Sequence, residues 1–224
     1  MPSKNIVKQY LENGIYHIYN RGVEKRIIFK DKKDCIVFLH YLKLYLSPVN
    51  DLLEDKTKIL RMNRYIRKNL SSEINLIAFA LMPNHIHLII KQFSLNGIVK
   101  LMQRLTTAYV MYFNKKYQRI GSLFQNTYKA VLIEKDEYLL HLSRYIHLNP
   151  MKDNLAAKFS EFSSYSYFLG DKKVSWVKPK VILDYFKSAK KEGKYRFNSY
   201  QSFVEDYKIE PEKIVGDLKL EDEY

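Results

Sequence analysis

Two histidines one residue apart are the first residues of this sequence that could do chemistry together. His85 and His87 lie in a short apolar segment that follows a turn signal, Pro83-Asn84. Alternate side chains of a β-strand project from the same face, so the two imidazoles would lie side by side. Two neutral imidazoles directed at one point supply half of a metal site. The alternative is a pair of buried histidines whose ring nitrogens hydrogen-bond to the backbone.

A second set of polar residues lies within residues 136–149, where the spacing of the apolar residues predicts a helix. His141, Tyr145 and Asn149 are four residues apart and share one stripe of that helix. If this stripe faces the two histidines, the site gains a phenol and an amide oxygen, and such mixed ligands suit Mg²⁺ or Mn²⁺. Tyrosine can attack phosphorus and keep the phosphoester energy in a covalent intermediate. Because the chain has 19 tyrosines, the alternative for Tyr145 is an ordinary helix-packing aromatic.

The charge of the chain indicates the kind of partner. Its net charge of +14 favours a polyanion such as nucleic acid, through phosphate contacts and counterion release. A basic, tyrosine-rich proteome is the alternative explanation. The single cysteine, Cys35, excludes an internal disulfide, and the chain has neither an 18-residue apolar run nor the apolar core of a signal peptide. We therefore expect a cytoplasmic protein that does not enter a membrane.

The elements that must position these residues follow the order strand, helix, strand, strand, helix, strand, helix. The expected strands are residues 14–22, 74–81, 85–90 and 128–133, and the expected helices are residues 31–46, 95–117 and 136–149. The second and third strands should pair as an antiparallel hairpin, and Pro150 should end the last helix. This order predicts an α+β, ferredoxin-like fold, which is an antiparallel sheet with helices on one face, plus an extra helix.

Two stretches fall outside that order. Residues 49–71 are polar and lysine-rich and are interpreted as a basic insertion, with a short helix expected at 58–70. Residues 171–224 are expected to form a small C-terminal helical appendage, which leaves residues 1–170 as the main domain.

Short motifs in a fixed order carry a resemblance to a known family. Residues 83–89 (Pro-Asn-His-Ile-His-Leu-Ile) and 144–150 (Arg-Tyr-Ile-His-Leu-Asn-Pro) together resemble the single-tyrosine HUH transposases. The branch that the chain resembles most is that of the REP-associated tyrosine transposases, within the IS200-like family. Further similarity lies in residues 16–22, 109–114, 121–125 and 163–165, so that the resemblance spans residues 12–170.

The resemblance implies an activity and assigns residues to it. His85 and His87 would be metal ligands, Asn149 would be the third protein ligand, and Tyr145 would be the nucleophile. Family members use Mg²⁺ or Mn²⁺ to nick single-stranded DNA near a hairpin foot, form a 5′-phosphotyrosine and rejoin strands. Tyr109 is the competing nucleophile, but it falls in an apolar row of its own helix.

The resemblance also implies single-stranded or hairpin DNA as the partner of a nucleoid-associated protein, and it leaves open whether the chain is a homodimer. Arg21, Lys25, Arg104 and Lys129 are the predicted DNA contacts. Two other functions remain as alternatives. One is a domesticated hairpin-binding module without catalysis. The other is a metal phosphohydrolase that uses water, which the lack of dense Asp and Glu clusters argues against.

Overall fold

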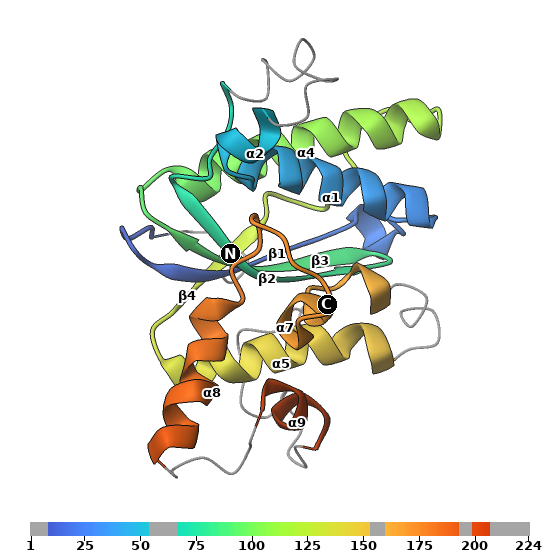
Figure 1. Cartoon of the computed structure of the whole chain (residues 1–224). Helices are drawn as coiled ribbons and strands as arrows, with labels where there is room; N and C mark the ends of the chain where they lie inside the picture. Colours follow the sequence, from blue (N-terminus) through green and yellow to red (C-terminus); the bar gives the residue numbers. More distant parts are fainter. Residues whose placement is uncertain (1–8, 54–66, 153–159, 193–198, 207–224) are drawn as a thin grey trace.

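Four strands form one antiparallel sheet in the order β2-β3-β1-β4 (Figure 1). The computed structural model describes residues 9–53, 67–152, 160–192 and 199–206. The strands are β1 (Ile15–Arg21), β2 (Ile74–Met82), β3 (His85–Gln92) and β4 (Lys129–Ile133). Their order, with helices in the two crossover connections, confirms the predicted α+β, ferredoxin-like arrangement.

The two crossover helices cover one face of the sheet, as predicted. α1 (Lys32–Leu46) connects β1 to β2, α4 (Gly97–Lys116) connects β3 to β4, and both lie on the same side of the sheet (Figure 1). Their aromatic and aliphatic side chains fill the space beneath them. Phe38 of α1 and Tyr109 of α4 meet edge to face, with 5.1 Å between ring centroids. This face is a conventional apolar core.

Reciprocal hydrogen bonds define the start of α1. The Asp31 carboxylate accepts from the backbone N–H of Asp34 at 3.0 Å, and the Asp34 carboxylate accepts from the backbone N–H of Asp31 at 3.4 Å. Lys116, in the last turn of α4, lies 2.7 Å from a carboxylate oxygen of each aspartate. The cap of α1 therefore also ties the two helices together.

The opposite face of the sheet is covered as well, by the extra helix that the sequence predicted after the fourth strand. α5 (Asp136–Lys152) lies across this second face (Figure 1). The shorter elements are η1 (Val23–Lys25), α2 (Val49–Leu53), η3 (Ser160–Phe162), α7 (Tyr165–Leu169), α8 (Lys180–Glu192) and α9 (Tyr200–Glu205). The physical reason lies in β2, which is buried at nearly every position instead of at alternate ones. A strand that is apolar on both sides needs cover on both faces.

α5 is longer than the sequence predicted. Pro150 was expected to end it, but the helix continues through Pro150 to Lys152. A proline this close to the helix end removes one backbone donor, which the last turn tolerates better than the helix interior does. Of the helix expected at residues 58–70, residues 58–66 lie outside the described residues, and residues 67–70 are not helical.

The C-terminal segment, which comprises the described residues 160–192 and 199–206, contacts both the sheet edge and α5. The backbone N–H of Ser164 donates to the Phe79 carbonyl and that of Lys178 donates to the Leu76 carbonyl, each at 2.8 Å. These contacts cover the outer edge of β2, which would otherwise be open to pairing. α8 and α9 bury apolar residues in the same cluster as α5. None of the described helices is long and apolar enough to cross a lipid bilayer.

Candidate metal site and nucleophile

β3 presents its two histidines to the face of the sheet that α5 covers. Ile86 and Leu88 belong to the core beneath α1 and α4, and the alternation of the strand turns His85 and His87 the other way. The two imidazole rings lie 4.9 Å apart between centroids. The residue opposite His87 on β2 is Ala80, whose small side chain leaves room for α5 to approach. The histidines therefore lie side by side, as the strand spacing predicted.

A hydrogen bond to the preceding amide orients the His85 ring. Nδ1 of His85 lies 2.6 Å from Oδ1 of Asn84. An amide oxygen can only accept, so Nδ1 carries the proton and Nε2 keeps its lone pair. Burial, with the Arg21 charge as a smaller cause, lowers the pKa of His85 to about 3. The ring is neutral at pH 7, which is the form that binds a cation.

His87 is held by a third histidine, which the sequence analysis did not single out. Nδ1 of His87 lies 2.9 Å from Nε2 of His17 on β1. Nε2 of His87 is buried and has no hydrogen-bond partner among the described residues. Burial is also the main cause that holds the pKa of His87 well below its usual value. His17 could have been placed on one face of its strand from the sequence, but only the pairing of β1 with β3 brings it to His87.

α5 brings the Tyr145 ring against His87. The two rings meet edge to face, with 5.8 Å between centroids and 85° between their planes. The Tyr145 residue is only 1% exposed, so its hydroxyl is closed to solvent unless neighbouring groups move. Tyr109, the competing nucleophile, lies on the other face of the sheet, where its hydroxyl donates to the Ile28 carbonyl. The structure therefore separates Tyr109 from the histidines and joins Tyr145 to them.

Asn149 follows Tyr145 by one turn of α5 and is also buried. Its Nδ2 has no hydrogen-bond partner among the described residues, and rotation of the amide would present Oδ1 in its place. α5 runs toward the end of the sheet at which β2 turns into β3, and β3 begins there with His85 (Figure 1). His141, at the other end of the predicted stripe, packs against Phe203 of α9 with 5.4 Å between ring centroids.

The donor set suits a hard divalent cation. Two neutral imidazoles and one amide oxygen leave positions that water and phosphate oxygens fill around Mg²⁺ or Mn²⁺. The described residues contain no group of three or more His, Cys, Asp and Glu side chains arranged for a metal ion. A cation at the histidine pair would therefore rely on oxygen ligands from an amide, solvent or substrate. The unpartnered, buried Nε2 of His87 agrees with such a site.

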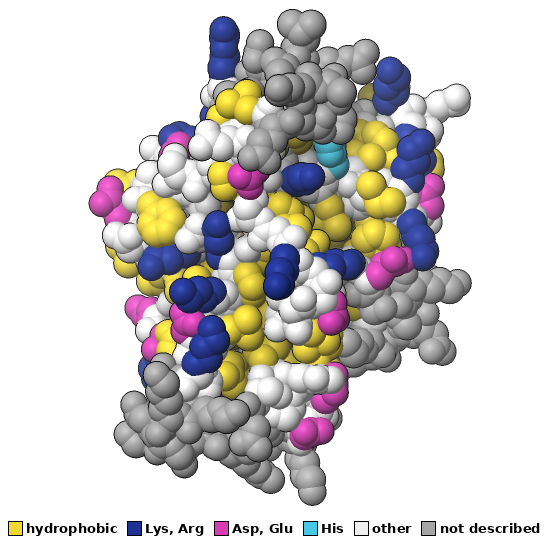
Figure 2. All heavy atoms as spheres, viewed as in Figure 1, with side chains coloured by type: hydrophobic (Ala, Val, Ile, Leu, Met, Phe, Trp, Pro, Cys, Tyr) yellow, Lys and Arg dark blue, Asp and Glu magenta, His cyan; other side chains and the backbone are white. Residues whose placement is uncertain are grey.

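The four cationic residues predicted to contact DNA do not share one surface. Arg21 pairs with His85 in the sheet, and the carbonyl of the exposed Lys25 accepts from the Asn84 amide, so these two lie at the histidine end of the sheet. Arg104 lies on α4 and donates to the Lys68 carbonyl at 2.6 Å. Lys129 is buried on β4, and burial lowers its pKa. On the face drawn in Figure 2, Lys and Arg side chains are scattered among acidic and apolar groups.

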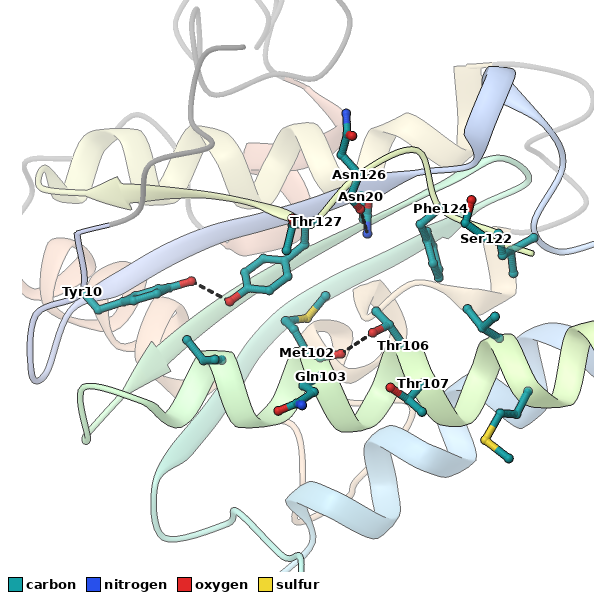
Figure 3. A pocket seen from close by; sticks show the side chains of 15 residues that line it. Tyr10, Asn20, Met102, Gln103, Thr106, Thr107, Ser122, Phe124, Asn126 and Thr127 are labelled. Atoms are coloured by element: carbon teal, nitrogen blue, oxygen red, sulfur yellow. Dashed lines mark hydrogen bonds between the residues drawn. The ribbon is translucent and has the colours of Figure 1, made fainter. Parts of the chain in front are cut away.

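A cavity of about 800 Å³ lies between α4 and residues 122–128 (Figure 3). Aromatic rings line part of it, and the hydroxyls of Tyr10 and Tyr128 are 2.7 Å apart at its wall. Asn20 of β1 also lines it, and Asn20 follows His17 by three positions, so the two side chains lie on opposite faces of the strand. The sheet therefore separates this cavity from the histidine pair.

A comparison with known protein families gives one match. Residues 50–149 match the family model described as transposase IS200 like, and this range contains both histidines, Tyr145 and Asn149. The resemblance found in the sequence is confirmed: over this range the chain is similar to the IS200-like transposases. No curated protein gives a significant match.

One similar solved structure is that of a REP-associated tyrosine transposase bound to a REP hairpin. It shares 13% sequence identity with the chain at a TM-score of 0.43, and the match covers 79% of this chain and 92% of that one.

Proposed function

We propose that the protein is a metal-dependent transposase that nicks and rejoins single-stranded DNA near hairpins through a 5′-phosphotyrosine. The observation that carries the proposal is the meeting of three side chains from two distant elements. His85 and His87 lie together on β3, and α5 sets the Tyr145 ring against His87. The match of residues 50–149 to the IS200-like transposase family and the net charge of +14 support a DNA substrate.

Each residue has a defined role in this proposal. The Tyr145 hydroxyl attacks the phosphorus of a phosphodiester, a tyrosine–phosphate bond forms, and the bond to the 3′-oxygen breaks. The phenol loses its proton, and the departing oxygen gains one to become a free 3′-hydroxyl. His85, His87 and Asn149 would hold Mg²⁺ or Mn²⁺, which supplies charge neutralisation at the phosphate. A later attack by a 3′-hydroxyl on the phosphotyrosine rejoins the strands and frees Tyr145.

The burial of Tyr145 favours a second candidate function. A phenol that is 1% exposed needs a movement of α5, or of the groups packed around it, before it can meet DNA. If no such movement occurs, the protein is a non-catalytic module that binds DNA hairpins. The two candidates differ in one product, the covalent protein–DNA adduct.

The test incubates the full chain with a labelled DNA hairpin that carries single-stranded flanks, in the presence of Mn²⁺. We expect an adduct that survives denaturing electrophoresis, and we expect its loss in Tyr145→Phe, in His85→Ala and after addition of EDTA. Tyr109→Phe is the matched control, because it removes a buried hydroxyl from the other face of the sheet. It should retain the adduct.

Two results would decide against the proposal. An adduct of normal yield in Tyr145→Phe would exclude this tyrosine as the nucleophile. Tight hairpin binding that is independent of metal, with no adduct under any condition, would establish the non-catalytic module instead.

A further inference from the structure

We propose that Asn84 and His17 are positioning residues that set the proton of each histidine on Nδ1, so that both present Nε2 to one cation. The inference rests on the metal-dependent function proposed above. It concerns side chains that the motif comparison leaves without a role. Metal-binding imidazoles generally donate their second ring N–H to a neighbouring acceptor, which fixes both the tautomer and the ring orientation.

Asn84 can offer only an acceptor to His85, because its other amide atom is already engaged. Its Nδ2 donates to the Lys25 carbonyl at 3.4 Å, so the atom that faces His85 Nδ1 at 2.6 Å is Oδ1. The backbone of Asn84 is fixed as well, since its carbonyl accepts from the Gly22 N–H at 2.8 Å. The turn before β3 therefore holds the acceptor in place, and His85 must be protonated at Nδ1.

The turn that follows β1 requires glycine at residue 22. A Cβ at residue 22 would lie 2.2 Å from the Arg26 carbonyl oxygen. The tight turn at residues 22–26, whose first N–H donates to the Asn84 carbonyl, therefore has no room for a side chain at residue 22.

His17 and His87 share a single proton between two nitrogens 2.9 Å apart. If His87 donates it, Nε2 of His87 has a lone pair for a cation. If His17 donates it, Nε2 of His87 carries the other proton and has no lone pair for a cation. A cation at Nε2 of His87 therefore requires His87 to be the donor and His17 the acceptor. The rings are nearly parallel, with 16° between planes, and both are buried, so solvent does not replace the contact.

The first measurement reads the tautomers directly in the metal-free full chain. Nitrogen-15 imidazole spectra at pH 7.5 should show Nδ1–H for both His85 and His87. Replacement of the acceptor should change the affected ring only: His17→Phe for His87, and Asn84→Leu for His85. An Nε2–H tautomer at either histidine of the unmodified protein would overturn the proposal, whatever its activity.

The second measurement is Mn²⁺ affinity, by calorimetry or by titration of the free-ion paramagnetic resonance signal. We expect His17→Phe and Asn84→Leu to weaken binding about 10- to 100-fold. His17→Gln and Asn84→Asp retain an acceptor and should restore most of the affinity. His87→Ala defines complete loss of the site, and circular dichroism checks that each variant is folded.

The outcomes separate this proposal from the one on which it rests. If the unmodified protein and His87→Ala bind Mn²⁺ equally, the metal site fails, while the tautomer spectra still test the positioning. If the site binds Mn²⁺ but His17→Phe changes neither the affinity nor the His87 tautomer, the positioning role is wrong. If His17→Gln abolishes binding as fully as His87→Ala does, His17 is itself a ligand, and the proposal is also wrong.

Discussion

The two faces of the sheet are both buried, but they are filled with different chemistry. Beneath α1 and α4 the core is aromatic and aliphatic, with Phe38 and Tyr109 in contact at its centre. On the α5 side lie His17, His85 and His87. Every buried histidine of the described residues lies on this side. One face is therefore an apolar core, and the other combines an apolar cluster with neutral imidazoles in a protein interior, where protonation is unfavourable.

The α5 side itself divides into two parts. His85 and His87 leave ring nitrogens available, whereas His147 is satisfied on both sides of its ring. Its Nδ1 lies 2.7 Å from the Tyr200 hydroxyl of α9, and its Nε2 lies 2.6 Å from the Ser164 hydroxyl. A histidine with two partners connects the C-terminal segment to α5, and a histidine with one partner is suited to bind a ligand.

The largest expected effect is on the apolar face. Phe38→Ala removes a fully buried ring from between Phe29 and Tyr109. The lost burial and the cavity left behind should lower the free energy of unfolding by about 4 kcal/mol. Urea denaturation measures it. Ile36→Ala, on the exposed side of the same helix, is the control and should cost less than about 1 kcal/mol. Equal losses in the two variants would contradict the assignment of this face as the core.

The next largest expected effect is on the pH dependence of stability, and it tests the face that carries the histidines. Burial lowers the pKa of His147 to about 3, below the usual unfolded value of about 6.5. Between these values the unfolded chain binds the extra proton, so the stability that His147 confers is full above pH 6.5 and falls as the pH decreases. The slope for one such histidine is about 1.4 kcal/mol per pH unit.

His147→Gln tests this slope, because glutamine keeps a donor and an acceptor but does not titrate in this range. Urea denaturation of the metal-free protein from pH 7.5 to pH 5 should give a pH dependence shallower by about one proton. Other titrating groups are common to both proteins and cancel in the comparison. Identical slopes would mean that His147 is protonated in the folded protein.

The smallest expected effect is at the edge of the apolar face. Asp31→Ala removes the oxygen that accepts from the Asp34 N–H and should cost about 1 kcal/mol. Asp31→Asn keeps a capping oxygen and loses only the exposed charge that faces Lys116, so it should cost a few tenths of a kcal/mol. Thermal unfolding of the two variants measures the difference. A larger loss in Asp31→Asn would show that the ion pair matters more than the cap.

Local patterns were sufficient for most of the fold. Apolar spacing predicted the four strands and the three long helices. Local patterns did not place α5 on a particular face of the sheet, and Pro150 did not end α5. Both points have the same origin, because which face a helix covers, or whether a helix end tolerates proline, depends on what packs against it.

The sequence by itself determined that two imidazoles share a strand face and that a phenol and an amide share a helix stripe, because these relations follow from the geometry of one element. Only the tertiary structure decided that Tyr145 meets His87, that Tyr109 lies across the sheet, and that His17 contacts His87. The contacting residues are 58 positions apart for Tyr145 and His87, 81 for Tyr109 and Ile28, and 70 for the two histidines. Such contacts depend on strand register and helix packing, which no local pattern encodes.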